Sequence, residues 1–406
     1  VKLGKPKTPK RITVCEDETF HPAPCLVAIE PVSNFVLLET YAEHRDAATW
    51  NAALGGALAE LPVRVIQSTS DEGKGLLAHV RAGLGAHHSP DVFHVQHEMS
   101  QATSISLARQ VRQADQEVAC AAERLTAQGQ EAQARETTPH GPGRPVDFEK
   151  RIAAAEVAHA EAMQTLEIAR ARQERARRAI RGIGQDYHPV DLKTGQLQSV
   201  PEVTAKLEEH FAELAAAAEE AALPDRCHKG IRKAHRVLPA LAATLTFFHR
   251  EVASSVAELG LTPEETCAVT DCLIPAVYLK RAADKARLAD EREPLRQLAE
   301  QRRLAAAEAA PTLADRTPEF RAYMDLVVTN CADLFQRASS CVEGRNGQLS
   351  LRHHHLHTIS TTRLEALTAM HNYFIQRPDG TTAAQRFFGR KPDDLFQWLL
   401  DRLDLP

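Results

Sequence analysis

The sequence has few aromatic residues and lacks a long apolar run. Phe, Trp and Tyr make up 5% of the 406 residues, and no stretch reaches the roughly 20 consecutive apolar residues that a membrane-spanning helix needs. The opening VKLGKPKTPK carries lysines with no apolar segment behind them, which excludes a secretory signal peptide. It also lacks an initiator Met, so we expect a fragment or a processed chain that works in the cytoplasm.

The eight cysteines are scattered, and no two of them form a CxxC pair. This excludes a disulfide framework and a zinc site built from paired cysteines, and it favours free thiols in a reducing compartment. The GxxxxGK[ST] spacing of a phosphate-binding loop is absent, although Gly73 and Gly75 flank Lys74. A GxSxG motif and a repeat of fixed period are also missing, so the sequence gives no sign of a serine hydrolase or a repeat protein.

The overall charge does not by itself suggest a nucleic-acid partner. The formal net charge is −5, with 43% hydrophobic and 25% charged residues, which is typical of a globular protein. Basic residues nevertheless gather in three clusters. These are Lys2, Lys5, Lys7, Lys10 and Arg11; Arg170, Arg172, Arg175, Arg177, Arg178 and Arg181; and Arg226, Lys229, Arg232, Lys233 and Arg236. Each cluster alone is best explained as a solvated helix face, but together they favour a surface that contacts phosphates.

Short apolar runs separated by Pro, Gly, Asn and Ser fill residues 11–100 and predict an α/β fold. The expected elements are strands Ile12–Cys15, Cys25–Ile29 and Phe35–Tyr41, helix Asp46–Glu60, strand Val63–Gln67, helix Glu72–Gly83 and strand Val92–His97. Their order is that of a ribonuclease-H-like mixed sheet, in which the first and fourth strands lie side by side. The sequence therefore predicts that Asp17 and Asp71, at the ends of those strands, meet.

The pattern changes near Ser100 to long helical stretches. Ser100–Glu136 and Phe148–Arg181 have helical spacing and are separated by the Pro- and Gly-rich Thr137–Asp147, which predicts a long helical hairpin suited to self-association. Further helices are expected over Glu202–Ala222, Asp225–Leu259, Thr262–Ala289, Glu291–Ala309, Phe320–Ser339, Thr361–Phe374 and Pro392–Leu403. We expect a basic linker over 1–10, a first core part over 11–100, an all-helical insertion over 101–318, and a second core part with a tail over 319–406.

The acids Asp17 and Asp71 would repel each other at adjacent strand ends unless a cation lay between them. Mg²⁺ prefers oxygen ligands, and two such ions about 4 Å apart support phosphodiester chemistry. A third carboxylate is then needed from a later helix. The alternative is that both are ordinary strand-end acids, with Asp71 capping the helix that begins at Glu72.

Several segments of the chain resemble bacterial transposases that carry a DDE triad on a ribonuclease-H-like core. The segments are ITVCEDETF, VIQSTSDEGKGLLAHV, DVFHVQHE, SSCVEGRNGQLSLRHHHLH and NYFIQRPDGTTAAQRFFG, within residues 11–100 and 325–390. The resemblance implies that Asp17, Asp71 and Glu343 are the catalytic, metal-binding triad. Glu343 follows Asp71 by 343 − 71 = 272 residues, and an insertion domain, which some of these transposases carry at this point, accounts for the excess. The helix-turn-helix DNA reader that usually precedes the core is missing from this chain.

Other residues are candidates for supporting roles. Glu343 is preferred over Glu319, Asp333 and Glu365 because Arg345, Asn346 and Gln348 surround it with groups suited to phosphate. Arg345, Asn346, Arg352 and Lys74 are candidates for contacting DNA. His94 is expected, by resemblance, to stabilise the attacking or leaving oxygen, whereas His97 is best explained as a core or edge histidine and His87 and His88 as loop residues. The run His353, His354, His355 and His357 favours a DNA-facing patch over a zinc site.

The resemblance implies a DNA transposase that uses Mg²⁺ or Mn²⁺ to cleave transposon ends and transfer the freed 3′-hydroxyl to target DNA. It also implies a homodimer or higher oligomer in the synaptic complex and an association with the bacterial nucleoid. Two alternatives remain open from the sequence. One is a metal-dependent nuclease or Holliday-junction resolvase on the same core, and the other is an inactive DNA-binding scaffold whose long helices mediate assembly.

Overall fold

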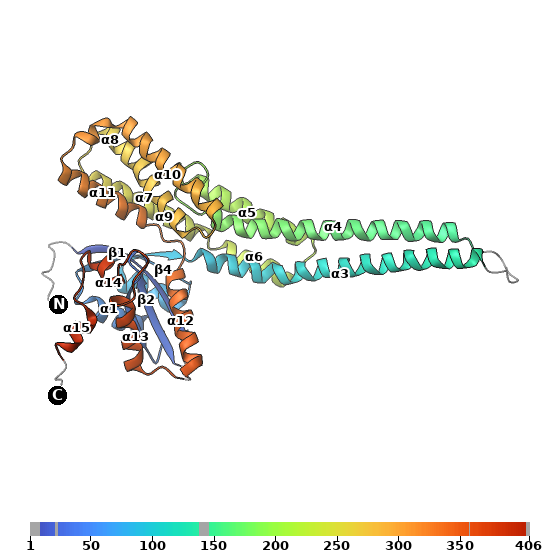
Figure 1. The fold of residues 1–406 in the computed structure, drawn as a ribbon, viewed down its shortest axis with the longest axis horizontal. Helices are drawn as coiled ribbons and strands as arrows, with labels where there is room; N and C mark the ends of the chain where they lie inside the picture. The colour runs from blue at the N-terminus through green and yellow to red at the C-terminus, as the bar shows by residue number, and fades with distance from the viewer. Residues whose placement is uncertain (1–8, 21–22, 138–145, 357, 403–406) are drawn as a thin grey trace. The chain divides into compact units, whose positions relative to one another are not determined.

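The computed structural model describes residues 9–20, 23–137, 146–356 and 358–402 (Figure 1). Most of the expected basic linker therefore lies outside the described residues. A mixed sheet of five strands is followed by a helical region, which confirms the α/β class. The strands are β1 Lys10–Phe20, β2 Pro24–Glu30, β3 Phe35–Tyr41, β4 Val63–Ser70 and β5 His87–Pro90.

The sheet has the order β3-β2-β1-β4-β5. β1 to β3 form an antiparallel meander, and β4 and β5 join parallel to β1. The expected side-by-side placement of the first and fourth strands is present. Cys15 of β1 pairs with Thr69 of β4, an offset of 54, and Asp17 and Asp71 have the same offset (71 − 17 = 54). The pairing register therefore brings Asp17 level with Asp71, which directly follows β4. Asp17 is not at the end of its strand as expected, because β1 continues to Phe20 and Asp17 pairs with Val27 of β2.

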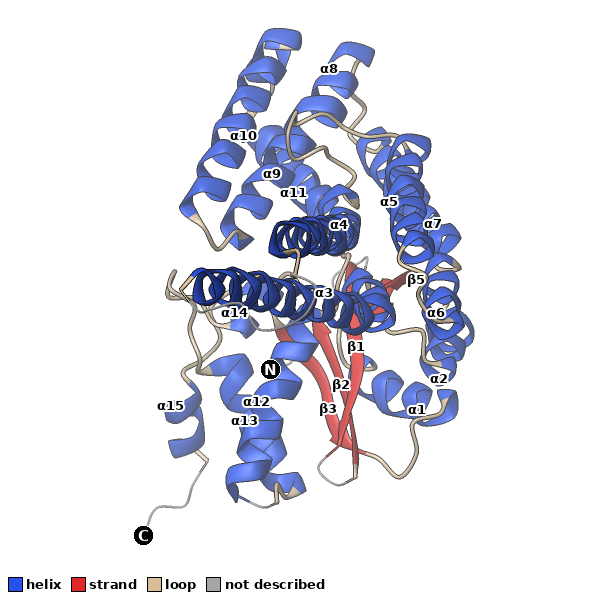
Figure 2. Cartoon of the chain, turned by 90° about the vertical axis from the view of Figure 1, so that its right-hand side faces the viewer, coloured by secondary structure: helices blue, strands red, loops and turns tan. Residues whose placement is uncertain are grey.

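Each face of the sheet is covered by helices, as Figure 2 shows. Ile12 and Val14 of β1 pack on one face with Trp50 of α1 (Ala47–Leu58) and Phe387 of α14 (Ala383–Phe388). The opposite face belongs to α12 (Ser340–Leu356) and α13 (Thr361–Tyr373), where Cys15 packs with buried residues of both helices. Because side chains alternate along a strand, Asp17 lies on the same face as Cys15, the face that α12 covers.

The last predicted strand is wrong in both position and type. Residues 92–97 begin the long helix α3 (Val92–Glu136), and the fifth strand is His87–Pro90, which we expected to be a loop. Val92, Val95 and Met99 are buried at helical spacing. Strand β5 has no apolar run; His87 is instead held by a ring stack on Phe247, at 4.6 Å between centroids, from α7 (Leu238–Ala257).

The second crossover also differs in detail from the expected single helix Glu72–Gly83. It consists of α2 (Lys74–Ala78) and a π-helical segment, His79–Leu84, which ends at Gly85 with a positive φ of 59°. The wider π turn directs the His79 side chain toward the face of the sheet that α1 covers, where it is 1% exposed.

The chain divides into two compact units, which differ from the four expected segments. The first comprises Val1–His94, Tyr187–Val203 and Pro239–Pro406, and the second comprises Val95–Asp186 and Thr204–Leu238. The predicted helical insertion 101–318 is therefore split between them. Besides α7, the sheet's unit takes α8 Pro263–Ala268, α9 Ile274–Lys285, α10 Ala289–Ala309, α11 Pro318–Asp333 and α15 Leu395–Leu400.

The second unit contains the predicted helical hairpin. Helices α3 and α4 (Phe148–Asp186) run side by side over most of their length (Figure 1). Arg170 of α4 forms an ion pair with Asp115 of α3, with 3.1 Å between Nη2 and Oδ1, and Leu166 packs against Ala114. The unit also includes α5 (Val200–Glu220) from Thr204 and α6 (Asp225–His235). The expected helix Asp225–Leu259 is two helices, because the chain turns at Arg236 between α6 and α7. Within the described part of the chain, none of the helices combines the length and the apolarity needed to cross a membrane.

Candidate functional site

The candidate site lies in the first unit, where α12 crosses β1. Asp91, directly after β5, holds the beginning of α12: its Oδ2 accepts hydrogen bonds from Ser339 N at 2.8 Å and Ser339 Oγ at 2.5 Å. The backbone carbonyl of Ser339 in turn accepts from the N–H groups of Val342 and Glu343. This contact fixes the first turn of α12, which carries Glu343, against the end of the sheet.

Asp17 is joined to α12 by a side-chain hydrogen bond. Asn346 Nδ2 donates to Asp17 Oδ2 at 2.8 Å, and the backbone N–H of Glu18 donates to Asp17 Oδ1 at 2.8 Å. Because Asn346 lies three residues after Glu343 on the helix, the two side chains share one face of α12. This hydrogen bond joins β1 to the helix that carries Glu343, between residues 329 positions apart in the sequence.

Burial is the main cause that raises the pKa of Asp17 to about 6. The negative charges of Asp71 and Glu18 raise it further, whereas the Glu18 N–H and His94 lower it. Asp71 and His94 are therefore electrostatic neighbours of Asp17. A carboxylate that is buried beside a second acid is destabilised in its charged form, and a bound cation would relieve that cost.

Asp71 occupies a turn beyond β4. Its Oδ1 accepts from Gly73 N at 3.0 Å, a local side-chain turn. The residue that caps α2 is Gly73, and it makes no side-chain cap bond. The alternative role that we considered for Asp71, capping the following helix, is therefore not what the structure has.

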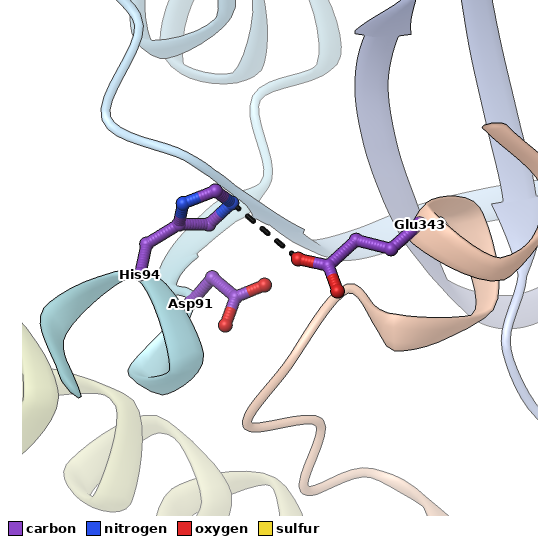
Figure 3. Close-up of side chains that lie close together, drawn as sticks. All are labelled: Asp91, His94 and Glu343. Carbon is purple, nitrogen blue, oxygen red and sulfur yellow. Dashed lines mark ion pairs between the residues drawn. The ribbon is translucent and has the colours of Figure 1, made fainter. Parts of the chain in front are cut away.

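The side chains of Asp91, His94 and Glu343 converge, as Figure 3 shows. One ligand atom from each lies within 4.8 Å of the others, and His94 Nε2 is 3.6 Å from Glu343 Oε1. Among the described residues, no other group of three or more potential metal ligands comes this close together. Asp91 also accepts from Phe93 N at 2.7 Å, so it is already engaged by three donors and acts mainly as a structural anchor.

Asp91 was missed in the sequence analysis. Its signal was an Asp directly before apolar residues at helical spacing, which is the pattern of a helix N-terminus. His94 was found, but on the expected strand rather than on α3. His97 is exposed and hydrogen-bonds Gln101 at 2.8 Å within α3, so it is not a core or strand-edge histidine.

Arg345 does not have the DNA-facing position that we expected. It is 5% exposed and forms two parallel hydrogen bonds with Glu39 of β3, Nε to Oε1 at 2.7 Å and Nη2 to Oε2 at 2.6 Å. Thr368 of α13 donates to the same carboxylate at 2.6 Å. A side chain buried and paired in this way anchors α12 to the sheet instead of lying open to a phosphate.

The remaining candidates lie on the surface. Arg352 on α12 and Lys74 at the start of α2 are exposed. The rival acids Glu319 and Glu365 are exposed on α11 and α13, and Asp333 pairs with Arg281 at 3.0 Å. His353, His354 and His355 lie in the last turn of α12, and His357 is outside the described residues. None of these acids takes part in the convergence around Glu343.

The donors around Asp17 and Glu343 are oxygen-rich. Carboxylate oxygens such as those of Asp17, Asp71 and Glu343 are ligands that Mg²⁺ and Mn²⁺ prefer. Among the described residues, however, these three do not form a group with one oxygen of each within 4.8 Å of the others. Asn346 Oδ1 is buried without a hydrogen-bond partner in the structure, although its amide nitrogen is bound to Asp17. A buried amide oxygen of this kind is satisfied by a water or a cation, so the chemistry of these donors suits a hard divalent ion, whereas their spacing in this structure does not yet enclose one.

Comparison with known proteins gives one family. A model described as a family of unknown function, DUF6399, matches residues 269–406. The match begins before α9 and contains Glu343 and Asn346, but it does not reach Asp17 or Asp71. A comparison with curated proteins gives no match. The C-terminal third of the chain is therefore similar to DUF6399.

Proposed function

We propose that this chain is a DDE-type DNA transposase whose first unit is a ribonuclease-H-like core. The observation that carries the proposal is the hydrogen bond from Asn346 to Asp17, because it joins the strand acid to the helix that bears Glu343. The sheet order β3-β2-β1-β4-β5 supports the proposal, since it is the order such a core requires and it sets Asp71 beside Asp17. The catalytic acids are Asp17, Asp71 and Glu343.

In this proposal the three carboxylates hold Mg²⁺ or Mn²⁺. When bound, two divalent ions supply Lewis-acid activation of the attacking oxygen and stabilisation of the leaving oxygen. Other side chains of the protein orient these carboxylates. Asn346 Nδ2 fixes the orientation of the Asp17 carboxylate, and Asp91 fixes the turn that carries Glu343. His94 Nε2, 3.6 Å from Glu343 Oε1, is placed to hydrogen-bond this carboxylate or a scissile phosphate oxygen.

Metal-dependent cleavage of plasmid DNA tests the proposal. With Mg²⁺ present, we expect nicking or linearisation by the wild-type chain and a loss of about 10³-fold in D71N and E343Q, which corresponds to several kcal/mol of transition-state stabilisation. E365Q is the matched control, because Glu365 is an exposed acid on the neighbouring helix α13. Equal activity in wild type, D71N and E343Q would contradict the proposal and favour a DNA-binding scaffold.

Strand transfer distinguishes a transposase from a nuclease. A pre-cleaved duplex with a free 3′-hydroxyl and a supercoiled target are mixed with the protein, and joined products are scored on a gel. If the protein is a transposase, we expect the duplex to be joined to the target in a reaction that needs Asp71 and Glu343. Cleavage without joining would identify a metal-dependent nuclease on the same core.

The hairpin formed by α3 and α4 is the proposed site of self-association, since synapsis needs two DNA ends held together. Its described surface exposes large apolar residues that a monomer would leave in water: Ile105 is 74% exposed and Val157 57% exposed. A dimer in light scattering that I105E and V157E convert to a monomer is the expected result. A wild-type monomer with DNA bound would count against this assembly.

A further inference from the structure

Helix α6 concentrates its basic residues on one face. The residues are Arg226, Lys229, Arg232, Lys233 and, at the C-terminal cap, Arg236, which we call the α6 basic face. At about 100° per residue these positions fall within an arc of roughly 120°. All five are exposed. The helix therefore presents a continuous cationic stripe about 15 Å long, ten residues at about 1.5 Å each.

The opposite face of α6 is buried within the second unit. Cys227, Ile231 and Ala234 are at most 4% exposed. Gly230 lies so close to α3 that a Cβ in its place would come within 2.8 Å of the Ala102 Cβ. The helix is therefore fixed against α3, and the direction in which its basic face points is determined by packing.

This face keeps most of its charge available. Of its members, Lys233 forms an ion pair with Glu98, and among the described residues no ion pair holds Arg226, Lys229 or Arg232. The arginines of α4 differ, because Arg170 pairs with Asp115 and Arg175 with Glu220. Of the two basic clusters on helices of the second unit, only the α6 cluster is left largely unneutralised.

The local charge opposes the charge of the whole chain. Over residues 225–236, five Lys and Arg residues and one Asp give 5 − 1 = +4, whereas the chain as a whole carries −5. A stripe this dense repels itself unless anions lie over it. Duplex DNA places one phosphate about every 3.4 Å along each strand, so a stripe of about 15 Å spans roughly four phosphates.

We propose that the α6 basic face binds the sugar–phosphate backbone of duplex DNA without reading its sequence. The face provides phosphate contacts that are separate from the catalytic acids. The identification of the polyanion as DNA rests on the proposed function. Lysine and arginine on a packed helix give positioning contacts, and base recognition is not needed for them.

Fluorescence anisotropy with a labelled 30-base-pair duplex of arbitrary sequence tests this inference. Binding is measured in EDTA from about 50 to 200 mM KCl, so that no cleavage occurs. We expect R226A/K229A/R232A to weaken binding at least tenfold at the lowest salt and to reduce the slope of log K against log[KCl] by roughly 2.7, about 0.9 for each lost contact. The charge-preserving variant R226K/R232K is expected to retain binding.

The matched control is R124A/R135A/K150A, which removes three exposed cations from the hairpin of the same unit. Wild-type affinity and salt slope are expected for it. Unchanged binding in the α6 variant, equal loss in the control, or no binding by the wild type would overturn the inference. The D71N variant distinguishes the two proposals. If D71N binds and cleaves DNA normally, the catalytic assignment alone is refuted. If cleavage needs Asp71 but binding does not depend on the α6 basic face, the α6 assignment alone is refuted.

Discussion

Arg345 of α12 and Glu39 of β3 form a buried two-point ion pair, with N–O distances of 2.7 and 2.6 Å. Their side chains are 5% and 0% exposed. The pair fixes the helix that carries Glu343 and Asn346 against β3, the edge strand of the sheet. A residue that the sequence suggested for DNA contact instead holds the candidate site together.

Removing one partner of this pair is expected to destabilise the fold. R345A leaves the Glu39 carboxylate buried with only the Thr368 hydroxyl as a donor, so we expect a loss of about 3–5 kcal/mol in the free energy of unfolding. R345K keeps the charge but loses the two-point geometry, and a smaller loss of about 1–2 kcal/mol is expected. Urea denaturation measures both. A loss below 1 kcal/mol in R345A would show that the pair contributes little.

A second buried pair supports β1 from the other face of the sheet. His79 Nε2 lies 3.1 Å from Glu16 Oε1, and Ser68 Oγ donates to Glu16 Oε2. His79 Nδ1 lies 2.5 Å from Asn51 Oδ1, so both ring nitrogens face acceptors. H79L is expected to cost about 3–5 kcal/mol, because it leaves the buried Glu16 carboxyl with only the Ser68 hydroxyl as a donor.

The double variant E16M/H79L tests whether the two residues act as a pair. Once both polar groups are removed, the loss is expected to be smaller than the sum of the single losses by at least about 1 kcal/mol. The measurement is a double-mutant cycle on urea unfolding. Simple additivity of the two single effects would contradict a direct interaction.

Asn346 is expected to affect metal binding more than folding. N346A removes the donor that orients Asp17, and loss of such a supporting hydrogen bond typically weakens a metal site 10- to 100-fold. The Mg²⁺ concentration at half-maximal cleavage should rise by about that factor, with a change in unfolding free energy of about 1 kcal/mol or less. Q348A, an exposed position on the same helix, is the control. An unchanged Mg²⁺ requirement in N346A would remove Asn346 from the site.

The stability of the first unit is expected to fall in mild acid through His87. Burial lowers the pKa of His87 to about 4, with further lowering by His88 and Arg250. The unfolded chain therefore takes up this proton first as the pH falls. The stabilisation is fully present above about pH 6.5 and is lost between about 6.5 and 4, at up to about 1.4 kcal/mol for each pH unit.

Replacing His87 with phenylalanine tests this pH dependence. H87F keeps a ring on Phe247, where the His87 stack has an interplanar angle of 6°, but it cannot be protonated. Unfolding free energies from pH 7.5 to 4.5 should fall less steeply for H87F than for wild type. H354A, at an exposed histidine of α12, should follow the wild-type slope. Parallel curves for H87F and wild type would contradict the assignment.

Much of the fold was predictable where hydrophobic spacing was strong. The first four strands and the α3–α4 hairpin have clear periodic apolar patterns, and the parallel pairing that brings Asp17 toward Asp71 follows from strand order. Strand β5 was not predictable in this way. Its sequence HHSP is polar, and it becomes a strand because Thr244 and Phe247 of α7 accommodate His87.

The site was predictable only in part for a similar reason. Glu343, within CVEGRNG, was found by resemblance, but the two glycines of that segment weaken a helical pattern, so α12 was not expected. Without the helix, neither the burial of Arg345 nor the contact of Asn346 with Asp17 follows from the sequence. Both depend on contacts between residues about three hundred positions apart.

The most direct test of the proposed centre is the location of Mn²⁺ in crystals of the full chain, measured by anomalous scattering. We expect Mn²⁺ bound by the carboxylates of Asp17, Asp71 and Glu343, and loss of that signal in D71N. Mn²⁺ bound elsewhere in the wild-type crystals, with none at these three carboxylates, would contradict it.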